Sequence, residues 1–403
     1  MKINIGVFFG GRSVEHEVSV ISALQAIRAF DREKYDVTPI YITREGRFYT
    51  GEALGHIEEF RDIPALLKKS QEVLPAMESG RLKLVRQPAP RFGKAVAAEI
   101  DVAFPIVHGT NVEDGALQGF LRTLGVPFAG CDVFASAVGM DKFAMKALFR
   151  ERGLPVLPCL RFTAREVFDG PEAVADKVME KIGLPVVVKP VNLGSSVGIR
   201  LARDREALLD ALDYAVSFAA AVIAEKAVEN LRELNCAVLG DADGVEASEV
   251  EEPIAGDEIL SYEDKYVSNA KGGAKSGGKS GMQSLKRLLP APISPELREK
   301  VRHCASEAFL ALDCAGVSRI DFLMDGKTGE IWVNEINTIP GSLSFYLWEP
   351  LGKPYARLLD ELVELALKRS RSAAEMNYTI DTGILKNASF GGAKGAKGSS
   401  AKR

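Results

Sequence analysis

The sequence is poor in cysteine and has no long apolar run. Its five cysteines are scattered, and no two of them form a CxxC pair; they are Cys131, Cys159, Cys236, Cys304 and Cys314. An odd, unclustered set fits free thiols in a reducing compartment better than a disulfide framework or a zinc site. No apolar segment reaches the length of a transmembrane helix, and the N-terminus shows no basic-then-apolar signal pattern. We therefore expect a cytoplasmic location and no binding to a membrane.

The sequence also lacks a strong excess of charge of one sign. It contains 51 lysines and arginines against 55 aspartates and glutamates, for a formal net charge of −4. This balance argues against general binding of nucleic acid. We find no internal repeat, and a hydrophobic content of 46% with 26% charged residues is typical of a soluble globular protein. Because 403 residues exceed a single core, two or three domains are expected.

Strand and helix patterns alternate near the N-terminus. Residues 2–9 form an apolar, β-branched run that meets Gly10 and Gly11, and residues 14–30 then show helical spacing. Such units open doubly wound α/β domains, in which ligands gather at the carboxyl ends of the strands. The glycine turn and His108 should therefore lie together, and for His108 a packing role and a functional role are equally favoured. The further predicted elements are strands at 36–42, 101–107 and 126–130, and a helix at 113–124 with two acids in its first turn.

A loop of glycine and serine joins two predicted strands within residues 184–200. Consecutive backbone N–H groups at residues 194–196 can wrap phosphate oxygens. Lys189 at the end of the first strand, and Lys142 at the start of a predicted helix, supply the matching charge. A flexible hairpin tip is the alternative interpretation. It is less favoured because an unpaired ammonium at the inner end of an apolar strand is costly to bury.

The segment from Arg319 to Gly341 alternates like two strands joined by a turn rich in aspartate and glycine. Period-two geometry places Asp321 on the same face as Arg319, and it places Glu335 and Asn337 on one face of the second strand. Oxygen ligands without cysteine or histidine suit a hard cation, and so few protein ligands suit Mg²⁺, which keeps positions for water and phosphate. A solvated strand face with an ion pair to Arg319 is the alternative.

The remaining segments indicate a strand that could bind an adenine base, a loop, two helices and a tail. Residues 221–226 form a strand whose exposed end, with an acid a few residues on, could hold an adenine edge and ribose hydroxyls. Residues 270–281 are a run of Gly, Ser and Lys that cannot bury a core and is typical of a lid or a linker. Amphipathic helices are predicted at 294–312 and 355–368, and the chain beyond 369 reads as a basic tail.

Motifs along the chain resemble those of the ATP-grasp ligases and, within them, the D-alanine:D-alanine ligases. The resemblance covers about residues 3–370. The matching segments, in chain order, are GGRSVEHEVS at 10–19, HGTNVEDGALQG at 108–119, MDK at 140–142, KPVNLGSSVG at 189–198, YEDKY at 262–266, RIDF at 319–322 and NEINTIPG at 334–341.

The resemblance implies an α/β and α+β multidomain protein, in which an N-terminal doubly wound α/β domain precedes a two-domain ATP-grasp fold that holds ATP between its two parts. The implied segments are 1–130 for the N-terminal substrate domain, 131–226 for the central small ATP-grasp domain, 227–370 for the C-terminal ATP-grasp domain with a lid loop at 261–290, and 371–403 for a disordered tail.

The implied activity is the ligation of two D-alanine molecules for peptidoglycan precursor synthesis. ATP would phosphorylate the carboxylate of the first D-alanine, and the amine of the second would attack the acyl phosphate. A carboxylate is a poor electrophile until it is phosphorylated, and phosphoryl transfer needs positioning and charge neutralisation more than covalent help. The implied cofactors and partners are ATP, two Mg²⁺ ions that Mn²⁺ can replace, small-molecule substrates and a second copy of the chain in a homodimer.

The resemblance also implies roles for individual residues. The implied catalytic residues are Glu15, Ser195, Lys265, Tyr266, Arg319 and Gly341. Those implied to bind the amino acids are His108, Glu113, Ser344, Tyr346 and Leu347. Those implied to bind ATP are Lys142, Lys189, Ser196, Glu225, Lys226, Val228 and Glu233. The implied metal ligands are Asp321, Glu335 and Asn337.

Within the implied catalytic set, Glu15, Ser195 and Tyr266 would form one hydrogen-bonded group that closes the three domains. Lys265 would reach the transferred phosphate. Arg319 and the backbone N–H of Gly341 would stabilise the developing oxyanion.

The chain departs from the family pattern at a few positions. Val112 replaces a glycine, and one extra residue lies between Lys226 and Glu233. A serine expected to bind the second carboxylate is replaced by Tyr346 in a gapless alignment, and Ser344 is the substitute on the same loop.

Three other functions remain open from the sequence. One is a ligase that joins D-alanine to D-serine or D-lactate, and a second is another ATP-grasp carboxylate–amine ligase. The third is a non-catalytic nucleotide-binding protein. Tyr266 disfavours the lactate version, and the presence of all the predicted basic and acidic residues disfavours the non-catalytic one.

Overall fold

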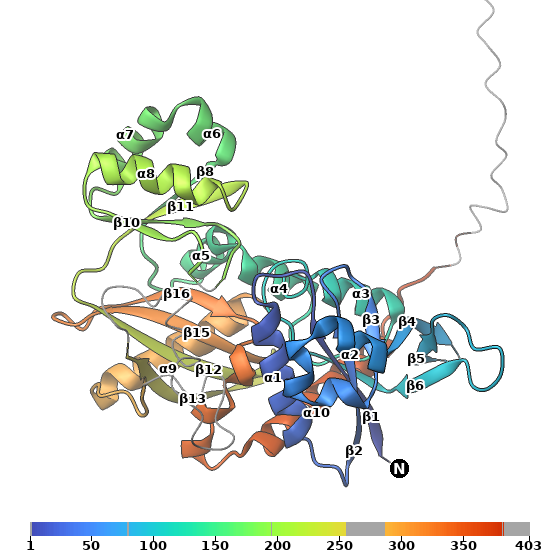
Figure 1. Ribbon diagram of the computed structural model, residues 1–403. Coiled ribbons are helices and arrows are strands. Elements are labelled where there is room, and N and C mark those ends of the chain that lie inside the picture. The colour runs from blue at the N-terminus through green and yellow to red at the C-terminus, as the bar shows by residue number, and fades with distance from the viewer. Residues whose placement is uncertain (1, 79, 195, 255–286, 381, 383–403) are drawn as a thin grey trace, which may run out of the picture.

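Three β-sheets with covering helices make up the computed structural model, which describes residues 2–78, 80–194, 196–254, 287–380 and 382 (Figure 1). The N-terminal sheet has the strand order β6-β5-β4-β3-β2-β1-β7. The middle sheet has the order β10-β9-β11-β8, and the third sheet has the order β14-β13-β12-β15-β16. Mixed sheets with packed helices confirm the predicted α/β and α+β multidomain class.

The N-terminal sheet is parallel at one side and antiparallel at the other. Strand β1 pairs in parallel with β2 and β7, and from Ile5 onward its residues are buried because helices and neighbouring strands cover them. An antiparallel ribbon then extends the sheet through β3 to β6. The strands are β1 (Ile3–Gly10), β2 (Tyr35–Ile42), β3 (Phe48–Thr50), β4 (Gln71–Glu78), β5 (Arg81–Arg86), β6 (Val96–Ile100) and β7 (Val102–Pro105). The helices are α1 (His16–Ala29), η1 (Glu52–Gly55), η2 (Ile57–Arg61), α2 (Ile63–Lys69) and α3 (Ala116–Leu124).

Two local predictions in this part were wrong. The predicted helix at 113–124 begins only at Ala116, because Gly115 adopts a positive φ of 95° and Glu113 folds back to accept the N–H of Gly109. Its two acids therefore precede the helix and do not lie in its first turn. The predicted strand at 126–130 is reduced to a single bridge between Ala103 and Phe128.

The middle sheet has one face in a hydrophobic core and the other toward a pocket. In β9, Val186 and Val188 pack under the helices, whereas Val187 and Lys189 line the pocket, as the two-residue period of a strand requires. Helices α6, α7 and α8 cover the core face (Figure 1). The elements are β8 (Cys159–Thr163), α6 (Ala164–Asp169), α7 (Pro171–Lys181), β9 (Val186–Pro190), β10 (Arg200–Ala202), α8 (Arg205–Val216) and β11 (Ala221–Lys226).

The third sheet contains the predicted hairpin. Strands β15 and β16 pair antiparallel with Asp321 opposite Glu335 and Arg319 opposite Asn337, and a bulge follows Asp321. The elements are β12 (Leu231–Asp241), β13 (Gly244–Pro253), β14 (Arg287–Leu288), α9 (Pro295–Ala311), β15 (Gly316–Asp325), β16 (Ile331–Asn337), η5 (Gly341–Leu347), η6 (Glu349–Leu351) and α10 (Tyr355–Ala374). The two predicted C-terminal helices are thus confirmed, and α10 extends past the predicted end at 368.

Each of the two largest hydrophobic clusters contains residues from distant parts of the chain. Helices α4 (Val133–Met140) and α5 (Lys142–Glu151) pack with the third sheet and α9. The core of the N-terminal sheet continues into η5 and α10, with Trp348 and Leu358 fully buried in it. No helix within the described residues is both long and apolar enough to cross a membrane. The segment limits implied by the resemblance stay a prediction.

Candidate active site

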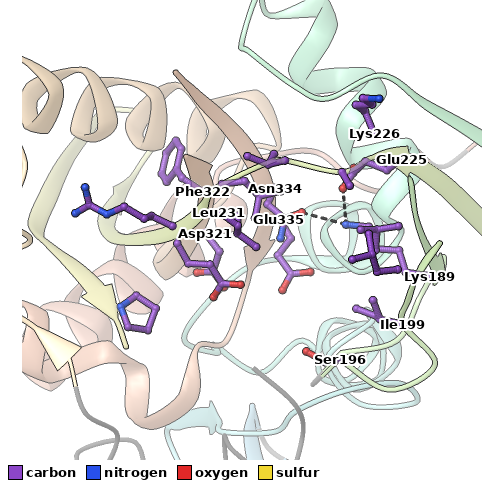
Figure 2. A pocket seen from close by; sticks show the side chains of 18 of the residues that line it. Lys189, Ser196, Ile199, Glu225, Lys226, Leu231, Asp321, Phe322, Asn334 and Glu335 are labelled. Carbon is purple, nitrogen blue, oxygen red and sulfur yellow. Dashed lines mark hydrogen bonds and ion pairs between the residues drawn. The ribbon is translucent and has the colours of Figure 1, made fainter. Parts of the chain in front are cut away.

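A pocket of about 850 Å³ lies between the middle and third sheets (Figure 2). Its wall combines charged groups with apolar surface from Val187, Ile199, Leu231 and Leu323. The residues predicted for ATP and metal that line it are Lys142, Lys189, Ser196, Glu225, Lys226, Val228, Glu233, Asp321 and Glu335. The fold therefore brings these nine residues together from five strands, one helix and two loops, whereas the predicted metal ligand Asn337 is not part of the lining.

Two lysines line the pocket with their ammonium groups already bound. Lys142 opens α5 behind the N-cap Asp141, and its Nζ donates to the carbonyl of Leu193 at 2.8 Å. The same Nζ lies 3.1 Å from Oε2 of Glu335. Lys189 Nζ donates to Oδ1 of Asn334 at 3.1 Å. Because each ammonium is nearly buried, these partners offset the cost of removing it from water.

Glu225 sits between two ammonium groups. Its Oε1 lies 2.7 Å from Nζ of Lys189, and its Oε2 lies 2.7 Å from Nζ of Lys146. Burial alone would raise the pKa of the Glu225 carboxyl, but the two lysines outweigh burial and lower this pKa. Sequence reasoning missed Lys146, although it lies one helical turn after Lys142 and so shares its face of α5.

The predicted metal ligands are neighbours on the β15–β16 hairpin. Figure 2 shows the carboxylates of Asp321 and Glu335 directed into the pocket, and Asn337 Nδ2 donates to Oδ2 of Asp321 at 3.0 Å. Arg319 also binds Asp321 through Nε and Nη2 at 2.6 and 2.7 Å, so the ion pair expected by the alternative interpretation is present.

The donor chemistry of this group fits a hard cation. Two carboxylates and one amide oxygen are the ligand types that Mg²⁺ prefers, and such a set leaves positions for phosphate oxygens. Among the described residues, no group of three or more His, Cys, Asp or Glu side chains is arranged to hold a metal ion. The predicted set has only two such side chains and relies on an amide as the third.

A second buried polar cluster lies where α1, the loop after β7 and the chain after β16 meet. Glu113 accepts the backbone N–H groups of Gly109 at 2.9 Å and Ile339 at 3.0 Å. Burial, with a contribution from the Glu15 carboxylate, raises the pKa of Glu113 to about 8. Burial lowers the pKa of His108 to about 4, so its imidazole is neutral near pH 7. Its Nε2 lies 3.1 Å from Oγ of Ser22 on α1.

Glu15 lies between two glycine loops at the edge of this cluster. A β-carbon on Gly109 would lie 2.9 Å from Oε2 of Glu15, and a β-carbon on Gly194 would lie 2.7 Å from the same atom. Only glycine lets both loops approach this carboxylate so closely. The cluster therefore adjoins the glycine and serine loop of the pocket.

The loop at the start of η5 has an unusual backbone. Ser342, Leu343 and Ser344 have φ values of 51°, 53° and 49°, which is the left-handed region that non-glycine residues rarely adopt. Helix α1 holds this turn, because Ser342 donates its N–H to Ser22 and its hydroxyl to Gln25. Oγ of Ser344 is buried and has no hydrogen-bond partner within the described ranges.

Tyr346 belongs to a network that sequence reasoning missed. Its hydroxyl donates to Oε1 of Glu251 at 2.8 Å, and Asn235 Nδ2 donates to the same oxygen at 3.0 Å. Arg287 Nη1 binds the other carboxylate oxygen at 3.1 Å, and its guanidinium lies 3.9 Å from the centroid of the Tyr346 ring. The side chain of the neighbouring Leu347 is fully buried in the hydrophobic core.

Several predicted positions lie outside the described residues. They are Ser195, Lys265, Tyr266 and residues 261–286 of the predicted lid loop. The expected hydrogen-bonded group of Glu15, Ser195 and Tyr266 therefore stays a prediction.

Comparison with known proteins identifies the family. The profile described as D-ala D-ala ligase N-terminus matches residues 4–131, and that described as D-ala D-ala ligase C-terminus matches residues 148–364. A D-alanine–D-alanine ligase of Acetivibrio thermocellus is 39% identical over 379 residues, covering 91% of this chain and 96% of that protein. The chain belongs to the D-alanine–D-alanine ligase family.

Solved structures of D-alanine–D-alanine ligases are also similar to this chain. The D-alanine–D-alanine ligase of Coxiella burnetii is similar with a TM-score of 0.74 and 29% identity, covering 93% of this chain and 98% of that one. The VanG D-Ala:D-Ser ligase of Enterococcus faecalis has a TM-score of 0.73 and 29% identity, covering 91% and 100%. Members of the D-alanine–D-alanine ligase fold thus include a ligase named for a different second amino acid.

Proposed function

We propose that this protein uses ATP to join two D-alanine molecules into D-alanyl-D-alanine for peptidoglycan precursor synthesis. The observation that carries the proposal is the pocket between the two ATP-grasp sheets, where two lysines face two carboxylates beside a glycine and serine loop. The match to D-alanine–D-alanine ligases over 91% of the chain supports the same reaction.

ATP binds in this pocket with its base toward the end of β11. The apolar surface of Val187, Leu231 and Leu323 suits a purine ring, while Glu225, Lys226, Val228 and Glu233 offer polar groups to its edge and to the ribose. The phosphates extend toward Lys142 and Lys189, and Ser196 on the loop covers them. Phosphate oxygens can then bind both the backbone N–H groups and the lysine charges.

Asp321, Glu335 and Asn337 are the residues that would hold two Mg²⁺ ions, or Mn²⁺ in their place. Bound there, the ions neutralise phosphate charge during transfer. The two carboxylates keep their place because adjacent strands fix their backbones and because Arg319 and Lys142 neutralise them in the present arrangement.

The amino acid substrates bind on the side of Glu15 and the left-handed turn. The carboxylate of Glu15 faces the ammonium of the first D-alanine, with neutral His108 and mainly protonated Glu113 beside it. Because those neighbours carry little charge near pH 7, Glu15 provides most of the attraction for a cation. The second D-alanine lies near η5, where Ser344, Tyr346 and the Leu347 backbone are the candidates for its carboxylate.

During transfer, Arg319 and the N–H of Gly341 stabilise the charge that develops on the reacting carboxyl oxygen. Ser195, Lys265 and Tyr266, which lie outside the described residues, are the further catalytic residues of this proposal. Two copies of the chain form a homodimer, and the enzyme works in the cytoplasm.

A phosphate-release assay with purified protein tests the reaction. With ATP and Mg²⁺, D-alanine should release phosphate and yield D-alanyl-D-alanine, whereas L-alanine should not. Pairing D-alanine with D-serine or with D-lactate tests the alternative products. A larger mixed product than dipeptide at equal concentrations would assign the protein to that alternative, and phosphate release with no D-amino acid would contradict ligation.

A further inference from the structure

Lys146 is a fully buried ammonium behind the nucleotide pocket. It has no exposed surface, and it does not line the pocket that Lys142 and Lys189 line. Its Nζ approaches Oε2 of Glu225 to 2.7 Å, while Lys189 occupies Oε1 of the same carboxylate. A ligand in the pocket can therefore touch Lys189 but not Lys146.

The two lysines and the single carboxylate carry a net charge of +1. Without Lys146, Glu225 and Lys189 would form a neutral pair, and the attraction of Lys189 for an anion would be cancelled by the carboxylate next to it. With Lys146 present, the carboxylate is neutralised from behind. Burial lowers the pKa of Lys146, and the 2.7 Å contact between its Nζ and Oε2 of Glu225 is the geometry of an ammonium–carboxylate ion pair.

We propose that Lys146 is a positioning residue that reserves the charge of Lys189 for the phosphates of ATP. It acts through Glu225 and does not touch the nucleotide. This inference rests on the proposed function, because it assumes that phosphate lies beside Lys189. It predicts a specific defect on removal of the charge: phosphate binding weakens while binding of the nucleoside is retained.

The test uses Lys146→Gln in the full-length protein. Glutamine removes the charge and keeps a hydrogen-bond donor, on a side chain that is one atom shorter. Calorimetry with ATP and with adenosine, at low and high salt, should show about ten-fold to a hundred-fold weaker ATP binding, as expected for loss of one charge near the phosphates in a partly buried site. The affinity for adenosine, which carries no phosphate, should change by less than about three-fold.

Two rescue variants separate charge from shape. Lys146→Arg keeps the charge and should bind ATP nearly as the wild type does. The double variant Lys146→Gln with Glu225→Gln returns the group to a net charge of +1, so its ratio of ATP to adenosine affinity should recover most of the loss. A double variant that folds and binds ATP no better than Lys146→Gln would overturn the proposal.

Met145→Ala is the matched control, because Met145 is also fully buried on α5 but carries no charge. It should lower the melting temperature through a cavity and leave the ratio of ATP to adenosine affinity unchanged. An equal change of that ratio in Met145→Ala and Lys146→Gln would show that only packing is involved. Because binding is measured directly, wild-type protein that fails to bind ATP would contradict the proposed function itself, whereas wild-type-like binding by Lys146→Gln contradicts only the role of Lys146.

Discussion

Removing the hydroxyl of Tyr346 should destabilise the protein far more than removing the hydroxyl of its neighbour Tyr355. The Tyr346 hydroxyl donates to the carboxylate of Glu251, which is 2% exposed. A hydrogen bond to a buried charged group contributes about 1.5–3 kcal/mol to stability. Tyr346→Phe should therefore lower the free energy of unfolding by this amount, because Asn235 and Arg287 remain as donors but cannot replace the lost one.

Tyr355→Phe is the matched control. Its ring stacks on Phe345 at 4.4 Å between centroids, yet its buried hydroxyl has no hydrogen-bond partner in the described part of the chain. A buried hydroxyl without a partner costs free energy, so its removal should leave stability unchanged or raise it by up to about 1 kcal/mol. Both substitutions remove one oxygen and keep the ring, so hydrophobic burial is the same in the comparison.

The assay is urea unfolding of the two variants and the wild type, followed by D-alanine-dependent phosphate release. Tyr346→Phe should also raise the KM for D-alanine, because Tyr346 lies two residues after Ser344 in η5 and its hydroxyl ties η5 to Glu251. In a double-mutant cycle, Glu251→Gln should reduce the cost of Tyr346→Phe, since the charged acceptor is gone. Equal loss of stability in the two tyrosine variants would refute the reasoning, because it would show that the bond to Glu251 contributes nothing beyond packing.

Three further predictions concern the acids and one glycine. Glu335→Gln should keep the melting temperature but lower Mg²⁺-dependent phosphate release by roughly a hundred-fold or more, since a neutral amide cannot balance the charge of the metal. Near-normal phosphate release would show that Glu335 is not a metal ligand. Folding raises the pKa of Glu113 from 4.5 to about 8, so the native state binds more protons than the unfolded state between these pH values. The free energy of unfolding should therefore fall by about 1.4 kcal/mol for each pH unit through that window. Urea midpoints of Glu113→Gln that fall with pH as steeply as those of the wild type would contradict this. Gly194→Ala should impair D-alanine-dependent turnover because its β-carbon would lie 2.7 Å from Glu15, whereas Gly55→Ala, whose β-carbon meets nothing within 4 Å, should not.

Local patterns made the β15–β16 hairpin predictable. Its strands alternate with a period of two, and its turn contains Asp325, which accepts the backbone N–H groups of Lys327 and Thr328. Such contacts lie within a few residues, so the sequence carries them directly. The resemblance then supplied what periodicity does not, namely which residues from distant segments line one pocket.

Long-range partners were not predictable in the same way. Three helices and three strands separate Lys146 from Glu225 in the chain, and Glu251 meets Tyr346 only after the third sheet and η5 have packed. The acids at 113 and 114 looked like helix N-terminal residues, but Glu113 instead binds Gly109 and Ile339. The partners of such residues depend on tertiary contacts that no local sequence pattern encodes.

Two of the cations predicted to meet an anionic ligand are already held by carboxylates. Arg319 binds Asp321, and Lys142 binds Glu335. These carboxylates are also the predicted ligands of a cation, so an ion that occupies them competes with Arg319 and Lys142 for the same oxygens. Arg319 and Lys142 are held near the pocket before any ligand arrives. When a metal ion takes over their carboxylate partners, both side chains can bind a phosphate or carboxylate with little reorganisation. Binding of a divalent ion and binding of an anion should therefore reinforce each other, because each one satisfies the charges that the other leaves unpaired.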